Sequence, residues 1–280
     1  MAVHNARPGM LLDPGNPINK GLVAWWPMWE GAGSKCMDIS HKTNDGVSDR
    51  ANNGGMTNGP VWAACGVKFD GVDDYISYPT DIKFINRDFT IAGKMIINGA
   101  AGGPSPEHIV FVQRTDVGGT GQPIVHLGTT GSAPYNLKAV IRDNVGVATV
   151  LTGATSMSAG RAYSVAVTKT SSAIKIYLDG KEEASSSHSL TGSFSAGVVH
   201  RFLGKTRYTA ADQGFFNGSI HGLRVLLRAL SEIEIRQLHL NPNAGLWVPD
   251  MARYYLAAAG GFQPAWAANS NIVLNGTMAL

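Results

Sequence analysis

Short runs in which apolar and polar side chains alternate recur along most of the chain. In residues 162–168, Tyr163, Val165 and Val167 fall on one side of an extended backbone, because successive side chains of a strand point to opposite faces. Runs of this kind, and short apolar runs such as residues 22–26, which end at Pro27, predict β-strands. They cover residues 22–26, 67–69, 75–78, 89–97, 108–113, 123–127, 136–141, 145–151, 162–168, 173–178, 198–203 and 215–227.

The clearest turn signal is the pair Asp179-Gly180, which follows the alternating run 173–178. An Asp-Gly pair tolerates the positive φ angles of a type I′ turn. The sequence therefore predicts a tight hairpin at this point.

One short helix is predicted near residues 231–240. Ser231 and Glu234 have the spacing of a capping box, in which each side chain bonds the other residue's backbone N–H. Ile235 and Leu238 then form an apolar stripe, and Pro242 ends the helix.

Many short strands with a single helix indicate an all-β protein in which two antiparallel sheets bury their apolar faces against each other. We expect an N-terminal arm over residues 1–19, the sandwich over 20–240 and a C-terminal tail over 241–280. The Gly- and Asn-rich residues 30–60 are expected to form a long surface loop. The tail has no periodicity, and we expect its large aromatic side chains to anchor it on the sandwich or on a partner: Trp247, Tyr254, Tyr255, Phe262 and Trp266.

Composition narrows the functional classes. Of the 280 residues, 44% are hydrophobic and only 15% are charged, and the net charge of +3 has no Lys/Arg cluster that would indicate nucleic-acid binding. The first residues lack the apolar core of a secretory signal, and no apolar run is long enough to span a membrane, so neither is expected. Cys36 and Cys65 have no metal-binding spacing, and we expect two free, partly buried thiols while leaving a disulfide open.

Three segments, taken in order, resemble the laminin-G-like, concanavalin A-like lectin/glucanase superfamily. The first is the strand 21–27 with the E-G-A-G turn that starts at Glu30 and the D-I-S loop that starts at Asp38. The second is F-D-G-V-D-D-Y-I over residues 69–76, and the third is the strand 216–225 followed by R-A-L-S. The likeness covers roughly residues 20–240 and implies a jelly-roll sandwich, but it does not fix a ligand.

The residues after the sandwich carry a second resemblance. L-H-L-N-P over 238–242 and L-W-V-P over 246–249 are similar to the end of laminin-G-like proteins of tailed bacteriophages. This implies a non-enzymatic virion structural protein, in capsid decoration or in the tail and host attachment, that assembles in the host cytoplasm. Its implied partners are other virion proteins, further copies of itself and a host-surface glycan. A free carbohydrate-binding module is the alternative, and a polysaccharide hydrolase is a weaker one.

The superfamily resemblance raises the question of a bound calcium ion, since many relatives bind calcium. Asp38 matches the family's loop carboxylate, but His221 follows Ile220 where the family commonly has an acidic residue. We therefore expect no cofactor, with calcium at Asp38 left open. The acidic residues in 70–74 are interpreted as a turn whose carboxylates accept backbone N–H groups.

Catalysis is not predicted. Glycoside hydrolysis needs two facing carboxylates, whereas the neighbours Glu182 and Glu183 point to opposite faces and Glu107 is isolated. No G-x-S-x-G nucleophile motif occurs. His188 lies in a serine-rich run that is typical of a polar loop.

A sugar site would need an exposed aromatic ring beside polar loops. The candidates are Trp29, Trp62, Tyr135 and Tyr208. For Trp62, packing in the core or at its rim is the competing interpretation.

Overall fold

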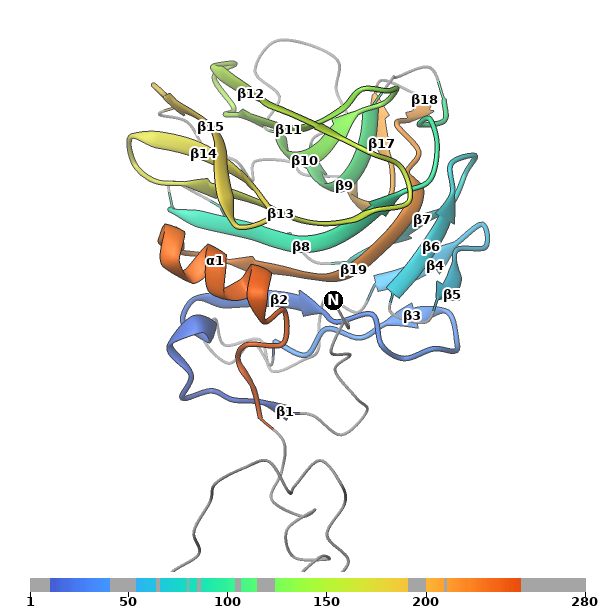
Figure 1. The fold of residues 1–280 in the computed structure, drawn as a ribbon, viewed down its shortest axis with the longest axis horizontal. Coiled ribbons are helices and arrows are strands. Elements are labelled where there is room, and N and C mark those ends of the chain that lie inside the picture. Colours follow the sequence, from blue (N-terminus) through green and yellow to red (C-terminus); the bar gives the residue numbers. More distant parts are fainter. Residues whose placement is uncertain are drawn as a thin grey trace, which may run out of the picture.

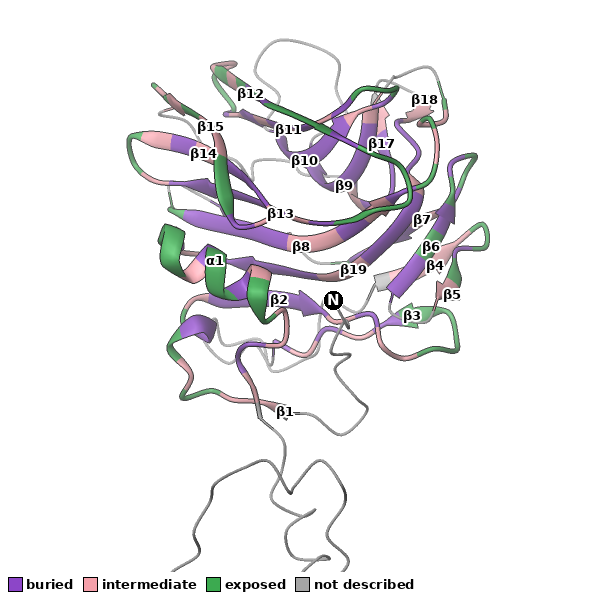
Figure 2. Ribbon diagram, in the orientation of Figure 1, coloured by how far each residue is buried: buried purple, intermediate pink, exposed green. Residues whose placement is uncertain are grey.

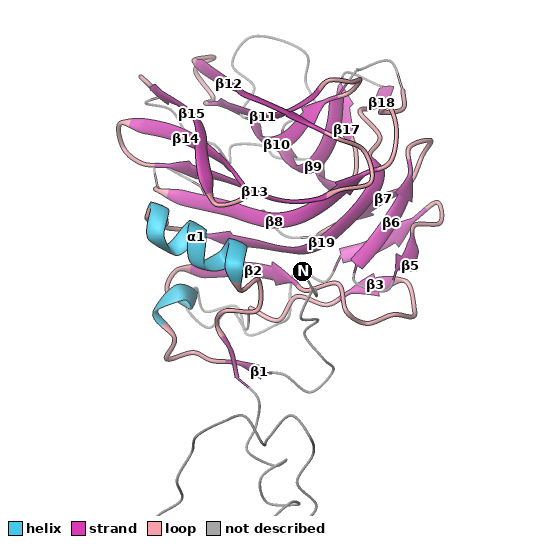
Figure 3. Ribbon diagram, viewed as in Figure 1, coloured by secondary structure: helices cyan, strands magenta, loops and turns pink. Residues whose placement is uncertain are grey.

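The computed structural model describes residues 11–40, 54–63, 66–79, 81–84, 87–103, 107–114, 124–190, 200–208 and 211–247. Within these residues, two eight-stranded antiparallel sheets account for most of the chain, which confirms the predicted all-β class (Figure 1). One α-helix accompanies the strands in the described part (Figure 3). None of the described helices is long and apolar enough to cross a membrane.

The first sheet has the strand order β12-β11-β10-β9-β16-β7-β4-β3, so β12 is one of its edges. Every neighbouring pair in it is antiparallel. Its strands are β3 (Lys35–Cys36), β4 (Gly54–Thr57), β7 (Tyr75–Ser77), β9 (Glu107–Arg114), β10 (Ile124–Thr130), β11 (Tyr135–Arg142), β12 (Ala148–Met157) and β16 (His200–Leu203).

The second sheet has the order β15-β14-β13-β8-β19-β6-β5, with β2 also paired to β19, so β15 is an edge. Its strands are β2 (Leu22–Trp26), β5 (Val61–Ala63), β6 (Gly66–Asp70), β8 (Phe89–Ile97), β13 (Ala162–Lys169), β14 (Ala173–Leu178), β15 (Lys181–Ser187) and β19 (Asn217–Leu226). The remaining elements are β1 (Leu11–Leu12), β17 (Thr206–Tyr208), β18 (Ala211–Gln213), β20 (Leu246–Trp247), a 3-10 helix (Pro17–Asn19) and α1 (Glu232–Leu240).

The main core lies between the two sheets and is made of alternate side chains. In β11, Tyr135, Leu137, Ala139 and Ile141 are buried, and the residues between them are partly exposed (Figure 2). This is the alternation that the sequence pattern predicts for a strand with one buried face. The largest fully buried side chains of this core are Trp26, Phe69, Tyr78, Phe84, Phe89, Phe111 and Phe216.

Both local predictions from turn and cap residues are confirmed. Asp179 and Gly180 have φ angles of 48° and 79° and join β14 to β15. At the start of α1, the Ser231 hydroxyl accepts the N–H of Glu234, and the Glu234 carboxylate accepts the N–H of Ser231. These bonds satisfy groups that a helix end leaves unpaired.

A second apolar layer lies on the outer face of the second sheet. Ile235 and Leu238 of α1 cluster there with Trp25, Ala166 and Tyr177. The alternation of β13 predicted one apolar face, but this layer buries its other face as well, because α1 covers the small side chain of Ala166.

The expectation of a surface loop over residues 30–60 was wrong in part, since β3 and β4 lie in this range and form the far edge of the first sheet. These strands are too short to show alternation, and their pairing with each other and with β7 defines them. Cys36 is buried in β3, and burial raises the pKa of its thiol. Cys65 lies outside the described residues.

The two ends of the described chain meet at one pole of the sandwich. Strand β1 pairs with β20, and the side-chain amide of Asn19 donates to the carbonyls of Asp13 (2.7 Å) and Gly245 (2.8 Å). Figure 1 shows this pole at the bottom, whereas the edge strands β12 and β15 lie at the top. The expected arm and the beginning of the expected tail are therefore joined to each other.

Candidate functional site

An open groove lies between the beginning of β12 and the end of β15. Its volume is about 490 Å³, within the ~300–1,000 Å³ that is typical of small-molecule sites. Residues 147–150, at the beginning of β12, form one wall, and residues 186–189, at the end of β15, form the other. We refer to it as the open-edge groove.

A tight turn between β11 and β12 positions the first wall. The Asp143 carboxylate accepts the N–H groups of Val145 (3.2 Å) and Val147 (2.9 Å), and Gly146 has a φ of 93°. Aspartate supplies the backbone acceptor and glycine the left-handed conformation that such a turn requires. The chain then enters β12 with Val150 exposed at the groove.

Hydroxyl groups and one histidine form the second wall. Ser187 and Ser189 are exposed, and His188 is held by two bonds. Its Nδ1 accepts the N–H of Leu190 (3.2 Å), and its Nε2 lies 2.9 Å from the carbonyl of Thr170. Both ring nitrogens of His188 thus have backbone partners.

Glu183 joins the two edges next to the groove. Its carboxylate accepts the N–H (3.0 Å) and the hydroxyl (2.9 Å) of Thr155 on β12. Its neighbour Glu182 instead pairs with Lys175 (2.7 Å). The two glutamates thus have different partners, and they do not form a facing pair of acids.

The chemistry of the groove follows from its lining. Aliphatic carbon and hydroxyl groups dominate, and no described lining residue is a carboxylate, lysine, arginine or cysteine. Hydroxyl groups both donate and accept hydrogen bonds, as the hydroxyl groups of a sugar do. This arrangement suits reversible binding of a hydroxyl-rich molecule and supplies no pair of groups for acid–base or nucleophilic chemistry.

The aromatic residues predicted as a sugar platform lie elsewhere. Trp29 and Trp62 are half-buried, and the indole N–H of Trp62 donates to a loop carbonyl at 2.7 Å. Tyr135 is buried, with its ring 5.5 Å from that of His108. Tyr208 belongs to β17, but its side chain is outside the described part. Trp29, Trp62 and Tyr135 are not among the described residues that line the open-edge groove.

The predicted anchoring residues fall almost entirely outside the described chain. Trp247 is the last residue of β20 and pairs with Leu11. The other four, Tyr254, Tyr255, Phe262 and Trp266, lie beyond residue 247. Their anchoring role stays a prediction.

The Asp38 carboxylate is buried and bonds the backbone. Its Oδ1 accepts the N–H groups of Trp25 (2.9 Å) and Ser40 (2.9 Å). We expect Asp38→Ala to lower the free energy of unfolding by about 2 kcal/mol, because two buried donors lose their acceptor. Urea denaturation measures this loss, and Asp38→Asn, which keeps one acceptor oxygen, should lose less. Equal melting temperatures in calcium and in EDTA are expected, and a rise in calcium would contradict that expectation.

The acidic residues in 70–74 form the predicted turn. Asp70 accepts the N–H of Val72 (2.7 Å), and Asp74 accepts the N–H of Asp70 (2.9 Å). Oxygens of Asp70, Asp73 and Asp74 lie within 4.8 Å of one another. Burial, followed by the charges of the other two aspartates, raises the pKa of Asp74. The backbone bonds account for this cluster as a turn.

Glu107 is not isolated, contrary to the sequence expectation. It forms an ion pair with Lys138, two strands away across Gly128, and lies 3.9 Å from Nδ1 of His126. A Cβ atom at Gly128 would stand 2.6 Å from Nε2 of His126, so only glycine leaves room for this ring. Burial lowers the pKa of His126 to about 4, and the Glu107 carboxylate opposes that shift.

Acid is therefore expected to destabilise the protein well before most carboxylates titrate. The pKa of His126, and also that of buried His108, is about 4 in the folded state, against about 6.5 in an unfolded chain. Between these values the unfolded chain binds more protons, so the free energy of unfolding falls as the pH falls. Urea denaturation between about pH 7 and about pH 4 measures the slope. His126→Gln should flatten this slope.

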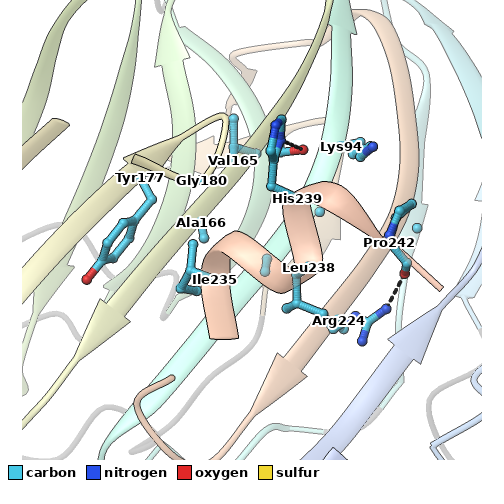
Figure 4. A pocket seen from close by; sticks show the side chains of 14 residues that line it. Lys94, Val165, Ala166, Tyr177, Gly180, Arg224, Ile235, Leu238, His239 and Pro242 are labelled. Atoms are coloured by element: carbon cyan, nitrogen blue, oxygen red, sulfur yellow. Dashed lines mark hydrogen bonds between the residues drawn. The ribbon is translucent and has the colours of Figure 1, made fainter. Parts of the chain in front are cut away.

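A cavity of about 30 Å³ under α1 is lined by Ser164 and His239, among other residues, and His239 is labelled in Figure 4. The Ser164 hydroxyl lies 3.0 Å from Nδ1 of His239, and an Asp179 oxygen lies 3.9 Å from the same nitrogen. A catalytic triad places its serine and its carboxylate on different ring nitrogens. This contact instead joins α1 to the β14–β15 hairpin.

A two-layer antiparallel sandwich with an uncharged groove at its open edge defines a lectin-like β-sandwich protein. A family model described as the concanavalin A-like lectin/glucanases superfamily matches residues 70–236. The chain belongs to this superfamily, as the sequence resemblance implied. No curated protein matches the chain.

Solved structures with a similar fold include enzymes and binding domains. Trypanosoma rangeli sialidase in complex with sialic acid matches with a TM-score of 0.56 at 19% identity, over 80% of this chain and 33% of that one. The binding domain of Paraclostridial Mosquitocidal Protein 1 matches with a TM-score of 0.52 at 13% identity, over 79% of this chain and 52% of that one. The receptor binding domain of botulinum neurotoxin D matches with a TM-score of 0.52 at 12% identity, over 80% of this chain and 54% of that one. This chain spans about a third of the sialidase and about half of each toxin domain, and at such identities the likeness shows the fold alone.

Proposed function

We propose that the protein is a non-enzymatic structural protein of a phage virion surface, held by its chain ends, whose sandwich presents the open-edge groove to a host-surface glycan. One observation carries the proposal: β1 and β20 pair at one pole, and β12 and β15, whose residues line the groove, lie at the other (Figure 1). A module attached near that pair would point its groove away from the particle.

The lining of the groove supports recognition over catalysis. Its described residues provide hydroxyl and aliphatic groups, and His188 has both ring nitrogens engaged. The likeness of the fold to two toxin binding domains is consistent with this role. The virion assignment, in capsid decoration or in the tail, is supported by the sequence resemblance of residues 238–249.

The binding part of the proposal is tested on a glycan array with the full chain, biotinylated at its N-terminus and tetramerised on streptavidin. A groove without an aromatic platform should bind weakly at a single site, and four linked copies compensate through avidity. Glycan binding by the tetramer is expected, and silence on the array would contradict the recognition role. Release of reducing sugar from polysaccharides would contradict the non-enzymatic role.

The attachment part is tested by truncation, and the fold determines where to cut. Deletion of residues 243–280, the natural choice from the sequence, would remove Ala244 and Gly245, whose carbonyls accept bonds from Arg224 and Asn19. Deletion of residues 248–280 leaves the described fold complete. We expect this shorter deletion to preserve the melting temperature and to prevent incorporation into particles. Normal incorporation of the truncated protein would contradict the anchoring role of the tail. In a separate measurement, sub-millimolar glycan binding by the isolated monomer would favour a free carbohydrate-binding module.

A further inference from the structure

We infer that the open-edge groove selects a neutral glycan over sialylated or sulfated ones. This inference rests on the proposed function and adds the class of ligand. Its basis is the absence of charge on all described lining residues, 147–150 and 186–189. An acidic group brought against these walls would lose part of its hydration without gaining a cation, which is costly.

His188 does not supply the missing charge. Its Nδ1 accepts the N–H of Leu190 at 3.2 Å, and its Nε2 lies 2.9 Å from the carbonyl of Thr170. Both ring nitrogens therefore already have backbone partners, and an acidic group in the groove would have to displace one of them.

The groups that remain match a neutral sugar. Thr149, Ser187 and Ser189 carry hydroxyls that can rotate to donate or to accept. Ser186 donates to the carbonyl of Ser187 at 2.8 Å and keeps its acceptor capacity. Val150 is 55% exposed and offers an aliphatic surface to the C–H face of a sugar ring.

The main alternative to a neutral ligand is an acidic glycan that binds Arg142. This arginine lies opposite Ala148 in the register of β11 and β12, so it is next to the groove without lining it. An acidic glycan that bound at this end of the sandwich would use this guanidinium, because arginine pairs with carboxylates and sulfates through two parallel bonds. Arg142→Gln therefore separates the two classes of ligand.

The test is an array of neutral, sialylated and sulfated glycans, probed with streptavidin tetramers of the full chain. We expect the wild type to bind neutral glycans, the double variant Ser187→Ala/Ser189→Ala to lose about tenfold or more in affinity, which corresponds to about 1.4 kcal/mol, and Arg142→Gln to bind normally. Ser185→Ala is the matched control, because Ser185 is exposed on the same strand outside the groove. Its binding should be unchanged.

Each other outcome has a defined meaning. Preference for acidic glycans that is lost in Arg142→Gln would overturn this inference and leave the proposed function standing. Neutral binding that the double serine variant leaves unchanged would show that the groove is not the site, and it would also overturn the inference. No binding to any glycan would refute the recognition role itself. Unchanged melting temperatures of the variants establish that they are folded.

Discussion

Replacement of Gly218 by alanine is expected to cost about 3 kcal/mol of stability or more, because overpacking meets backbone atoms that cannot move aside. Gly218 has a φ of 155°, and a Cβ atom there would lie 1.9 Å from the carbonyl oxygen of Ile96 on β8. Strand β19 is paired to β8 on one side and to β6 on the other, so it has little freedom to shift. Urea denaturation of the purified variant measures the loss, and failure to fold is the extreme form of the same result.

Gly160→Ala is the matched control for this prediction. Gly160 also has a positive φ, 79°, but nothing lies within 4 Å of the Cβ position. Alanine at this position should lower the free energy of unfolding only by the cost of the left-handed backbone, which is about 1–2 kcal/mol. Equal losses in the two variants would mean that β19 moves away from Ile96, contrary to the argument.

The second large effect is expected at Arg224. This side chain is buried, its guanidinium lies 3.7 Å from the ring centre of Trp25, and it donates to the carbonyls of Pro242 and Ala244. It thereby fastens the segment after α1 onto the outer face of the second sheet (Figure 4). Arg224→Ala leaves two carbonyls without their donor and removes the cation–π contact, so we expect a loss of about 2–4 kcal/mol in the free energy of unfolding.

Two comparisons test the reason for that loss. Arg236→Ala removes an exposed arginine on α1 and should change stability by less than about 0.5 kcal/mol. Arg224→Lys keeps a positive charge but not the planar fork, so it should recover only part of the loss. Hydrogen exchange should speed up first at residues 242–247 in Arg224→Ala. Unchanged exchange there would contradict the fastening role.

The sequence predicted those parts of the fold that depend on local chemistry. The strand predicted at 89–97 is β8 to the residue, because a long, mainly apolar run defines it. The Asp179-Gly180 turn and the Ser231–Glu234 cap were also predictable, since each depends on residues adjacent along the chain. Strands β3 and β4 were not, because two to four residues without alternation acquire strand geometry only from their neighbours in the sheet.

The candidate site was harder to predict than the fold. Its walls come from two edge strands of different sheets, and no spacing in the sequence brings residues 147–150 next to 186–189. Aromatic residues were a poor guide, since Tyr135 is used in packing against His108. The serine run at 185–189 after a hairpin was the available signal, and it indicated only a polar surface.

Glu183 affects how readily two copies of the protein can pair through their sheet edges. Strand β12 has ten residues and no charged side chain, and it is a sheet edge. The unpaired backbone groups of such an edge can form hydrogen bonds with a strand of another molecule, and this edge-to-edge pairing is a common route to aggregation of β proteins. By occupying the N–H of Thr155, Glu183 makes that continuation require the burial of a carboxylate. Copies of the protein held close together would then remain separate and not merge into a continuous sheet.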